Sequence, residues 1–202
     1  MKNFVFILFA VAALLLLSQG FISKSVAQTE QMSYELLQEI EGIEIRQYAP
    51  TLFSTVLLEG EGYRGNANSG FRVLAGYIFG DNQSNEKIAM TSPVVMEMKD
   101  QPVMKFMVPS AYSMEDLPRP NRDDIQFEHQ QSRIVAAIRF GGWANDKRIE
   151  EHIGKLRDVL DRNSIAYKEP FSFLGYNPPY EMINRRNEVI VELDDFQWDT
   201  SP

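Results

Sequence analysis

Few side chains in the 202-residue chain are of the types that carry out nucleophilic or metal chemistry. The sequence has no cysteine and two histidines, His129 and His152. Neither histidine has a His, Asp or Glu partner at the spacing of a metal site, and no thiolate or disulfide is available. We therefore interpret both histidines as structural or surface residues, and we predict no metal site.

The familiar catalytic motifs do not occur in this sequence. It contains no nucleophile elbow and no zinc-binding helix, and Gly60-Glu61-Gly62 lacks the lysine of a phosphate-binding loop. A carboxylate such as Glu97 would act as a general base if burial raised its pKa. Glu97 lies between Met96 and Met98 on an expected strand, so it points away from both, and we expect solvent exposure. No enzyme activity is predicted.

The charge balance limits the classes of partner. The chain has 28 acidic and 20 basic residues, a net charge of −8. Nucleic acids and anionic membrane surfaces both require a basic face, so neither is an expected partner. Arg185 and Arg186 form a small basic pair that would steer an anionic ligand or, more simply, pair with Glu181 or Glu188.

The first 27 residues have the pattern of a secretory signal peptide. Residues 4–17 form an uninterrupted apolar run, and Ser25-Val26-Ala27 places small residues where signal peptidase requires them. We predict cleavage before Gln28 and a secreted or periplasmic protein with no membrane span. Without cleavage, the segment would instead anchor the chain in a membrane.

The remaining residues, 28–202, are expected to form a single domain built from an internal repeat. Residues 43–60 resemble residues 125–142, and residues 88–93 resemble residues 165–170. The two copies, at about 34–108 and 125–193, each have the pattern strand, strand, helix, strand, strand. The helices are expected at residues 66–79 and 145–162, and the polar residues 28–33 as a flexible lead-in. The predicted fold class is α+β, a distorted antiparallel β-barrel of two pseudo-symmetric halves with two helices packed on the sheet.

Several motifs, in order along the chain, resemble one known family. They are Glu44-Ile45-Arg46-Gln47-Tyr48, the helix segment from Gly70 to Asn82, Lys87-Ile88-Ala89-Met90-Thr91-Ser92-Pro93-Val94, Gly175-Tyr176-Asn177-Pro178-Pro179 and Asn184-Arg185-Arg186-Asn187-Glu188-Val189. Together they resemble the SOUL haem-binding protein family over residues 34–193. The resemblance implies a distorted β-barrel of two similar halves that binds haem or another tetrapyrrole reversibly.

The resemblance also implies a ligand slot along the first helix. Its apolar residues would be Phe71, Leu74, Ala75 and Ile78 on the helix, with Met90, Met96 and Met98 on nearby strands. Without the resemblance, such a stripe at helical spacing favours an ordinary core. A tetrapyrrole requires cations for its propionates, and the positions where other members carry arginine and lysine are Asn68 and Gly76 here. Arg72, one turn from Asn68, is the first substitute, and Arg64 and Lys87 are further candidates.

The iron ligand is left open by the sequence. Some haem-binding members carry a histidine at the position of Gln47, and glutamine is a poor iron ligand. Met90 and Tyr77 have the right chemistry for an axial ligand, but nothing in the sequence selects either. Two alternatives to tetrapyrrole binding remain: a structural or protein-interaction module with the same fold, or a small-molecule enzyme that uses a buried carboxylate. Protein partners are not predicted.

Overall fold

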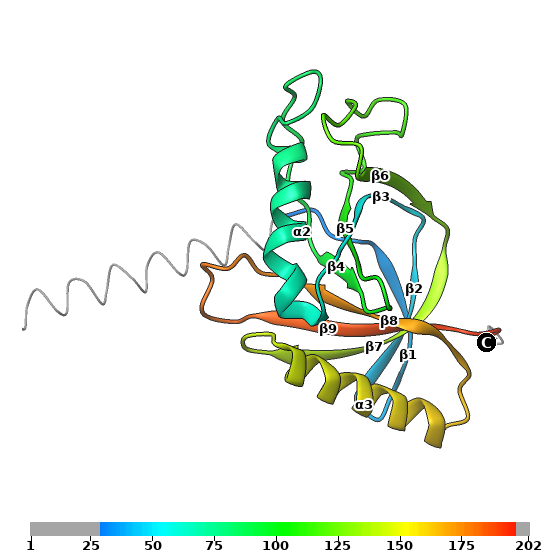
Figure 1. The fold of residues 1–202 in the computed structure, drawn as a ribbon. Coiled ribbons are helices and arrows are strands. Elements are labelled where there is room, and N and C mark those ends of the chain that lie inside the picture. Colours follow the sequence, from blue (N-terminus) through cyan, green and yellow to red (C-terminus); the bar gives the residue numbers. More distant parts are fainter. Residues whose placement is uncertain (1–28, 197–202) are drawn as a thin grey trace, which may run out of the picture.

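The computed structural model describes residues 29–196, so the predicted signal segment and its cleavage site lie outside the described residues. Nine strands form one sheet that curls on itself, and two helices pack against it (Figure 1). The elements in chain order are β1 (Tyr34–Ile40), β2 (Ile43–Tyr48), β3 (Thr51–Leu57), α2 (Gly62–Ile78), β4 (Val94–Glu97), β5 (Val103–Met107), β6 (Ile125–Gln130), β7 (Arg133–Gly141), α3 (Asp146–Arg162), β8 (Tyr167–Gly175) and β9 (Arg186–Leu193).

The order of strands explains how the two halves combine. It runs β1-β2-β7-β9-β8-β4-β5-β3-β6, and every neighbouring pair is antiparallel. One strand of each half crosses to the other, so that β2 pairs with β7 and β6 pairs with β3. The predicted fold class, an α+β distorted antiparallel barrel with two helices, is confirmed. The residue-by-residue sequence repeat stays a prediction.

Each strand points alternate side chains to opposite faces of the sheet, which gives the domain two interiors. One face packs against both helices and forms the larger apolar core, with Ile45, Met104 and Phe173 among its buried residues. The helix α2 lies on β3 and β5, while α3 lies on β7, β8 and β9 (Figure 1). The other face, enclosed by the curl of the sheet, holds a smaller apolar cluster that includes Phe53 and Ile190.

The helix α3 follows its sequence pattern closely. Asn145 caps its N-terminus, where the Asn145 side chain accepts a hydrogen bond of 3.0 Å from the Arg148 backbone N–H. Its buried side chains recur at helical spacing and pack on the sheet; they are Ile149, Ile153, Leu156, Val159 and Leu160. The helix expected at residues 145–162 is therefore confirmed within one residue.

The helix α2 begins at Gly62, four residues before the expected start at Asn66. Glycine is a poor helix former, which is why the sequence pattern places the start too late. Tertiary hydrogen bonds hold the first turn instead. The buried Asn66 amide donates to the carbonyls of Gly60 and Gly62, and Asp146 at the start of α3 accepts from the Tyr63 N–H. The two helix N-termini are thereby joined.

The polar segment 28–33 is expected from the sequence to be flexible. For residues 29–33, which the structure describes, this expectation is wrong. Met32 is buried in the apolar cluster of the enclosed face. The Ser92 N–H donates to the Glu30 carbonyl, and the Ser110 N–H donates to the Glu30 carboxylate. A single apolar residue among polar neighbours gives no periodic signal, so sequence patterns miss such a segment.

Candidate functional site

Four of the predicted slot residues lie beneath the surface. Leu74, Ala75, Ile78 and Met96 are between 0% and 7% exposed and belong to the core that both helices share. They pack between the helix and the sheet, as expected if the apolar stripe is an ordinary core face. Any ligand that reaches the predicted slot therefore contacts other side chains first.

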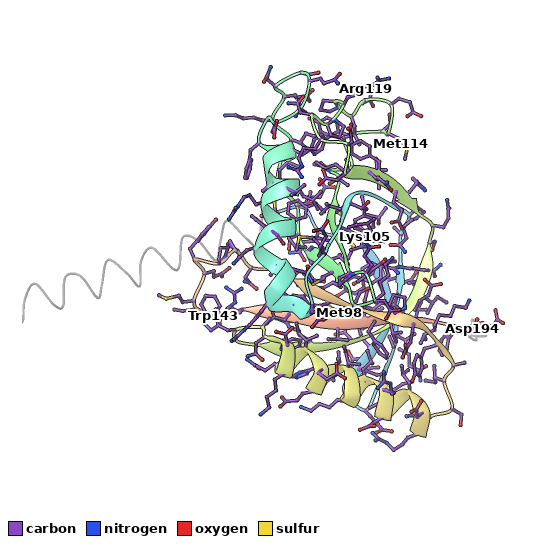
Figure 2. All side chains as sticks on the ribbon, viewed as in Figure 1. Met98, Lys105, Met114, Arg119, Trp143 and Asp194 are labelled. Atoms are coloured by element: carbon purple, nitrogen blue, oxygen red, sulfur yellow. The ribbon has the colours of Figure 1, made fainter. Side chains whose placement is uncertain are left out.

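Three predicted slot residues remain partly accessible. Phe71, Met90 and Met98 are half-buried and pack against the same core. The Phe71 ring lies 5.3 Å from the ring of Phe106 on β5, a tilted contact between aromatic side chains. Met98 lies where α2, α3 and the β4–β5 hairpin approach one another (Figure 2). Of these three side chains, Phe71 lies on α2 itself, and Met90 and Met98 lie before and after β4.

The outer face of α2 carries the predicted polar contacts. Arg64, Asn68 and Arg72 follow one another at intervals of four residues, so they lie on one side of the helix, and all three are exposed. Within residues 29–196, neither arginine makes a hydrogen bond or ion pair with another side chain. A Cβ added at Gly76 would meet only Asp81, at ordinary contact distance. This face can therefore receive an anionic group without breaking an existing ion pair.

Two clefts in the described part of the chain are considered as ligand sites, and the predicted site residues contribute little to either. A cleft of about 280 Å³ lies between α2, α3 and the β4–β5 hairpin, and Met98 is the one predicted site residue in its lining. A cleft of about 190 Å³ opens on the other face of the sheet. Its lining consists of Thr55, Leu57, Glu97, Lys99, Val103, Asp124, Gln126 and Glu128.

Of the two proposed iron ligands, Tyr77 is placed unfavourably. Its hydroxyl is buried and donates a hydrogen bond of 3.0 Å to the Pro118 carbonyl. Burial, helped by the negative charge of Glu86, raises the pKa of Tyr77 to about 12. The phenol therefore stays protonated at neutral pH, whereas an iron ligand would be a phenolate. Met90 is partly exposed.

Gln47 lies on a different strand from those that support α2. It is exposed on β2, and its amide donates a hydrogen bond of 3.3 Å to the Ser132 hydroxyl. The strand β2 pairs with β1 and β7, while α2 packs on β3 and β5 near the opposite end of the strand order. The main contacts of α2 are therefore with strands other than the one that carries Gln47.

The two histidines contact other protein groups. His152 Nδ1 lies 2.6 Å from the Arg148 carbonyl, and its ring stacks on Phe140 with centroids 4.1 Å apart. His129 Nδ1 lies 3.2 Å from the side-chain amide of Gln131. Among residues 29–196, no group of three or more His, Asp or Glu side chains is placed to hold a metal ion.

A buried cluster of charges on the enclosed face was not predicted from the sequence. Arg46 is 1% exposed and donates to both carboxylate oxygens of Glu188, which is fully buried, at 2.7 and 3.1 Å. Arg186 donates to the same carboxylate at 2.8 Å, so its expected pairing with Glu188 is confirmed. Tyr176 donates to it as well. Burial alone would raise the pKa of Glu188, but the bonds and charges of Arg46 and Arg186 outweigh burial and lower it.

Arg185 was expected to pair with a carboxylate, but it binds backbone carbonyl groups instead. Its guanidinium donates to the backbone carbonyls of Pro178 and Glu181 at 2.9 and 2.7 Å, and lies 4.2 Å from the centre of the Trp143 ring. These hydrogen bonds stabilise the β8–β9 loop, in part through the backbone carbonyl of Glu181. Both arginines of the pair are used within the fold.

Glu97 differs from the sequence expectation in two respects. Its side chain is 17% exposed, because the curl of the sheet encloses the face on which it lies. Burial would raise the pKa of Glu97, but ion pairs with Lys105 at 2.5 Å and Lys99 at 3.0 Å lower it. The expected solvent exposure is therefore wrong. A general base near neutral pH needs a raised pKa, so Glu97 is poorly suited to that role.

These lowered pKa values predict an acid limit to stability. A carboxylate with a lowered pKa stabilises the folded state above its ordinary value of 4.5, and this contribution is lost as pH falls through the folded-state pKa. We expect unfolding free energy measured in urea to fall below about pH 4.5. The Glu97→Gln variant should be less stable at pH 7 and should lose less on acidification. An equal acid-induced loss in both proteins would contradict this assignment.

No helix within residues 29–196 is long and apolar enough to cross a bilayer. Among solved structures, the C-terminal domain of EcmrR aligns with a TM-score of 0.58 at 8% identity, covering 82% of this chain and 100% of that chain. A hydrolase from Listeria innocua aligns with a TM-score of 0.54 at 7% identity, covering 85% and 96%. At such low identity these similarities concern the fold alone.

Sequence comparisons add the family. Heme-binding protein 1 of Xenopus laevis is 30% identical over 154 residues, which cover 72% of this chain and 80% of that protein. Heme-binding protein 2 of Homo sapiens is 29% identical over 155 residues, with coverage of 72% and 75%. The family model described as SOUL heme-binding protein matches residues 29–192, nearly the whole of the described fold. The chain therefore belongs to the SOUL heme-binding protein family.

Proposed function

We propose that this protein binds haem or a related tetrapyrrole reversibly along the outer side of α2, and that it acts as a binding protein without catalysing a reaction. The relatives are named for haem binding, which supports the ligand class. The observation that carries the location is the pair Arg64 and Arg72, exposed and unpaired within the described residues, on the helix that also presents Phe71.

The side chains along α2 fit a tetrapyrrole in part. When bound, haem would supply an iron centre, a flat apolar ring and two propionates. Phe71, Met90 and Met98 offer half-buried apolar contacts for the ring, and methionine adapts its shape to flat ligands. Arg64 and Arg72 are separated by eight residues, about 12 Å along a helix axis, and each presents a guanidinium fork suited to a carboxylate.

The arrangement predicts modest affinity. Four predicted slot residues are already buried, so a ligand would bury no further apolar surface on them; they are Leu74, Ala75, Ile78 and Met96. Affinity would come from the remaining apolar surface, at about 25 cal/mol per Å² before the costs of association. Asn68 and Gly76 lack the cations that other members are expected to place there. Adding a cation should therefore tighten binding.

The variant Gly76→Lys tests this location by gain of function. The added Cβ has space, and the new ammonium would extend from the same side of α2 as Arg72. We expect haemin to bind about threefold to tenfold more tightly, as one exposed charged contact adds roughly 1 kcal/mol. Haemin affinity is measured by visible absorption titration.

The matched control is Gly154→Lys on α3, where an added Cβ meets nothing within 4 Å. It gives the same change in charge and the same replacement of a helical glycine, so both variants should gain similar helix stability. Equal tightening of haemin in the two variants would show a general charge effect and would remove α2 from the site.

A second candidate function is a structural or protein-interaction module that keeps the fold without binding a tetrapyrrole. The burial of Leu74, Ala75, Ile78 and Met96 favours this alternative, because the family motifs would then specify packing. The third candidate, an enzyme with a buried carboxylate, is less well supported. Both Glu97 and Glu188 are held as ion-paired carboxylates of lowered pKa.

A further inference from the structure

Two neighbouring loops present a group of exposed apolar side chains. Trp143 lies in the loop between β7 and α3, and Tyr180, Met182 and Ile183 lie in the loop between β8 and β9. Their exposed fractions are 51%, 64%, 59% and 44%. We call these four residues the loop patch. A group of large exposed apolar side chains is typical of a surface that contacts another protein, a ligand or a membrane.

The loop patch is held together from beneath. The Arg185 guanidinium lies 4.2 Å from the centre of the Trp143 ring, so it connects the two loops. The Glu181 side chain is 2% exposed, and its carboxylate accepts a hydrogen bond of 2.7 Å from Asn177. The one acidic side chain within the β8–β9 loop is thus turned inward. The patch presents aromatic, aliphatic and thioether groups to its surroundings.

The N-terminal end of the described chain lies at the base of the same loop. The Arg186 guanidinium, at the start of β9, donates to the side chain of Gln31. Ser92, which bridges to Gln31, donates through its hydroxyl to the carbonyl of Tyr176, next to the end of β8. The chain therefore enters the domain between the two ends of the β8–β9 loop.

The sequence before this point contains the apolar run of residues 4–17. Only 12 positions separate residue 17 from residue 29, which amounts to at most about 40 Å of extended chain. While the apolar segment is attached and inserted in a membrane, one of the two outcomes that the sequence predicts, the domain is held at the bilayer surface. Such a tether makes even a weak surface contact favourable.

We infer that the loop patch inserts shallowly into the interface of the bilayer that holds the N-terminal segment. Trp and Tyr concentrate at membrane interfaces, and aliphatic side chains beside them enter the upper acyl region. The net charge of −8 disfavours attraction to anionic headgroups, so the contact is apolar and suits zwitterionic lipid. The loop patch does not include Arg64, Asn68 or Arg72, and the inference does not depend on tetrapyrrole binding.

Trp143 is a built-in reporter for this contact. The sequence has two tryptophans, so Trp198→Phe leaves Trp143 as the sole tryptophan, whose emission is excited selectively over that of the tyrosines. The full chain with this change is reconstituted into phosphatidylcholine vesicles that carry lipids brominated near the top of the acyl chain. We expect blue-shifted Trp143 emission that the brominated lipid quenches at least twofold. Emission that aqueous acrylamide quenches and brominated lipid leaves unchanged would overturn the inference.

Variants on the same reporter background separate insertion from simple proximity. Met182→Glu/Ile183→Glu should abolish quenching by brominated lipid, while the apolar segment keeps the chain in the vesicles. The control Leu57→Glu/Met114→Glu changes the charge equally at two exposed apolar side chains outside the patch, and should retain the quenching. Met114 and Trp143 lie far apart in the molecule (Figure 2). Equal loss of quenching in both variants would overturn the assignment.

Haemin provides the competing outcome. If haemin quenches Trp143 on the vesicles while brominated lipid does not, the loop patch faces a tetrapyrrole, and the membrane contact is rejected. If brominated lipid quenches and haemin titrates without changing Trp143 emission, both the membrane contact and a separate tetrapyrrole surface are supported. Failure of haemin to bind at all leaves the lipid result to decide the inference by itself.

Discussion

Replacing Glu188 with leucine is expected to lower the free energy of unfolding by about 3–5 kcal/mol. The Glu188 carboxylate is fully buried and accepts hydrogen bonds from Arg46, Arg186 and Tyr176. Leucine removes the acceptor and leaves the buried guanidinium of Arg46 without its main counter-charge. Removing one partner of a buried ion pair costs more than removing both, because the remaining charge stays desolvated.

The effect is measured by urea unfolding at neutral pH. The control is Glu192→Leu on the same strand, whose carboxylate is 3.7 Å from Arg133 and 39% exposed. It should cost less than about 1 kcal/mol. The double variant Arg46→Met/Glu188→Leu should recover part of the loss, because it removes both charges. Similar losses for the two single variants would show that the buried cluster does not stabilise the fold as described.

The second large effect concerns the ligand. The double variant Arg64→Glu/Arg72→Glu is expected to weaken haemin binding about 100-fold. Each substitution replaces a charged hydrogen-bond donor with a carboxylate that repels a propionate, at a cost of roughly 1.4 kcal/mol or more per site. Both residues are exposed, so the fold should keep its stability. Affinity is measured by absorption titration.

The control reverses charge equally on the other helix. Lys147 and Lys155 are also separated by eight residues on a helix, α3, and both are exposed. Lys147→Glu/Lys155→Glu changes the net charge by the same −4. It should weaken haemin binding by less than threefold, through long-range repulsion alone. Equal weakening in the two double variants would remove the α2 arginines from the site.

The sequence predicts a helix or strand well where residues within that element determine its bounds. The helix α3 has a capping Asn145 and a regular apolar stripe, and both features are visible in the sequence. The start of α2 is set by Asn66 and Asp146, which act across space on a glycine-rich turn. No local pattern contains that information. The docking of Met32 depends in the same way on an apolar cluster formed by distant strands.

The burial of charged residues could not be predicted from the sequence, for a different reason. Alternation along β2 indicates that Glu44, Arg46 and Tyr48 share one face, opposite Ile43 and Ile45. A flat sheet would expose that face to water. The sheet curls, so Arg46 is buried, and Glu97 on β4 becomes enclosed in the same way. Curvature is a property of the whole sheet, which a strand's own sequence does not encode.

For the candidate site, the sequence identifies the helix but not the accessible side chains. The stripe of Leu74, Ala75 and Ile78 is the same whether it lines a slot or a core, and the structure places it in the core. The exposed polar face of α2 is predictable from its spacing. The availability of Arg64 and Arg72 is not, because it depends on which carboxylates lie within reach.

Haemin titration of the chain from Gln28 onward, followed by visible absorption, tests the central claim most directly. This chain contains every described residue and lacks the N-terminal apolar run, which would bind haemin non-specifically. The proposed function predicts a saturable change in the Soret band with one-to-one stoichiometry at micromolar concentration or below. A weak change that grows without saturation would contradict it and would favour the fold as a structural or protein-interaction module.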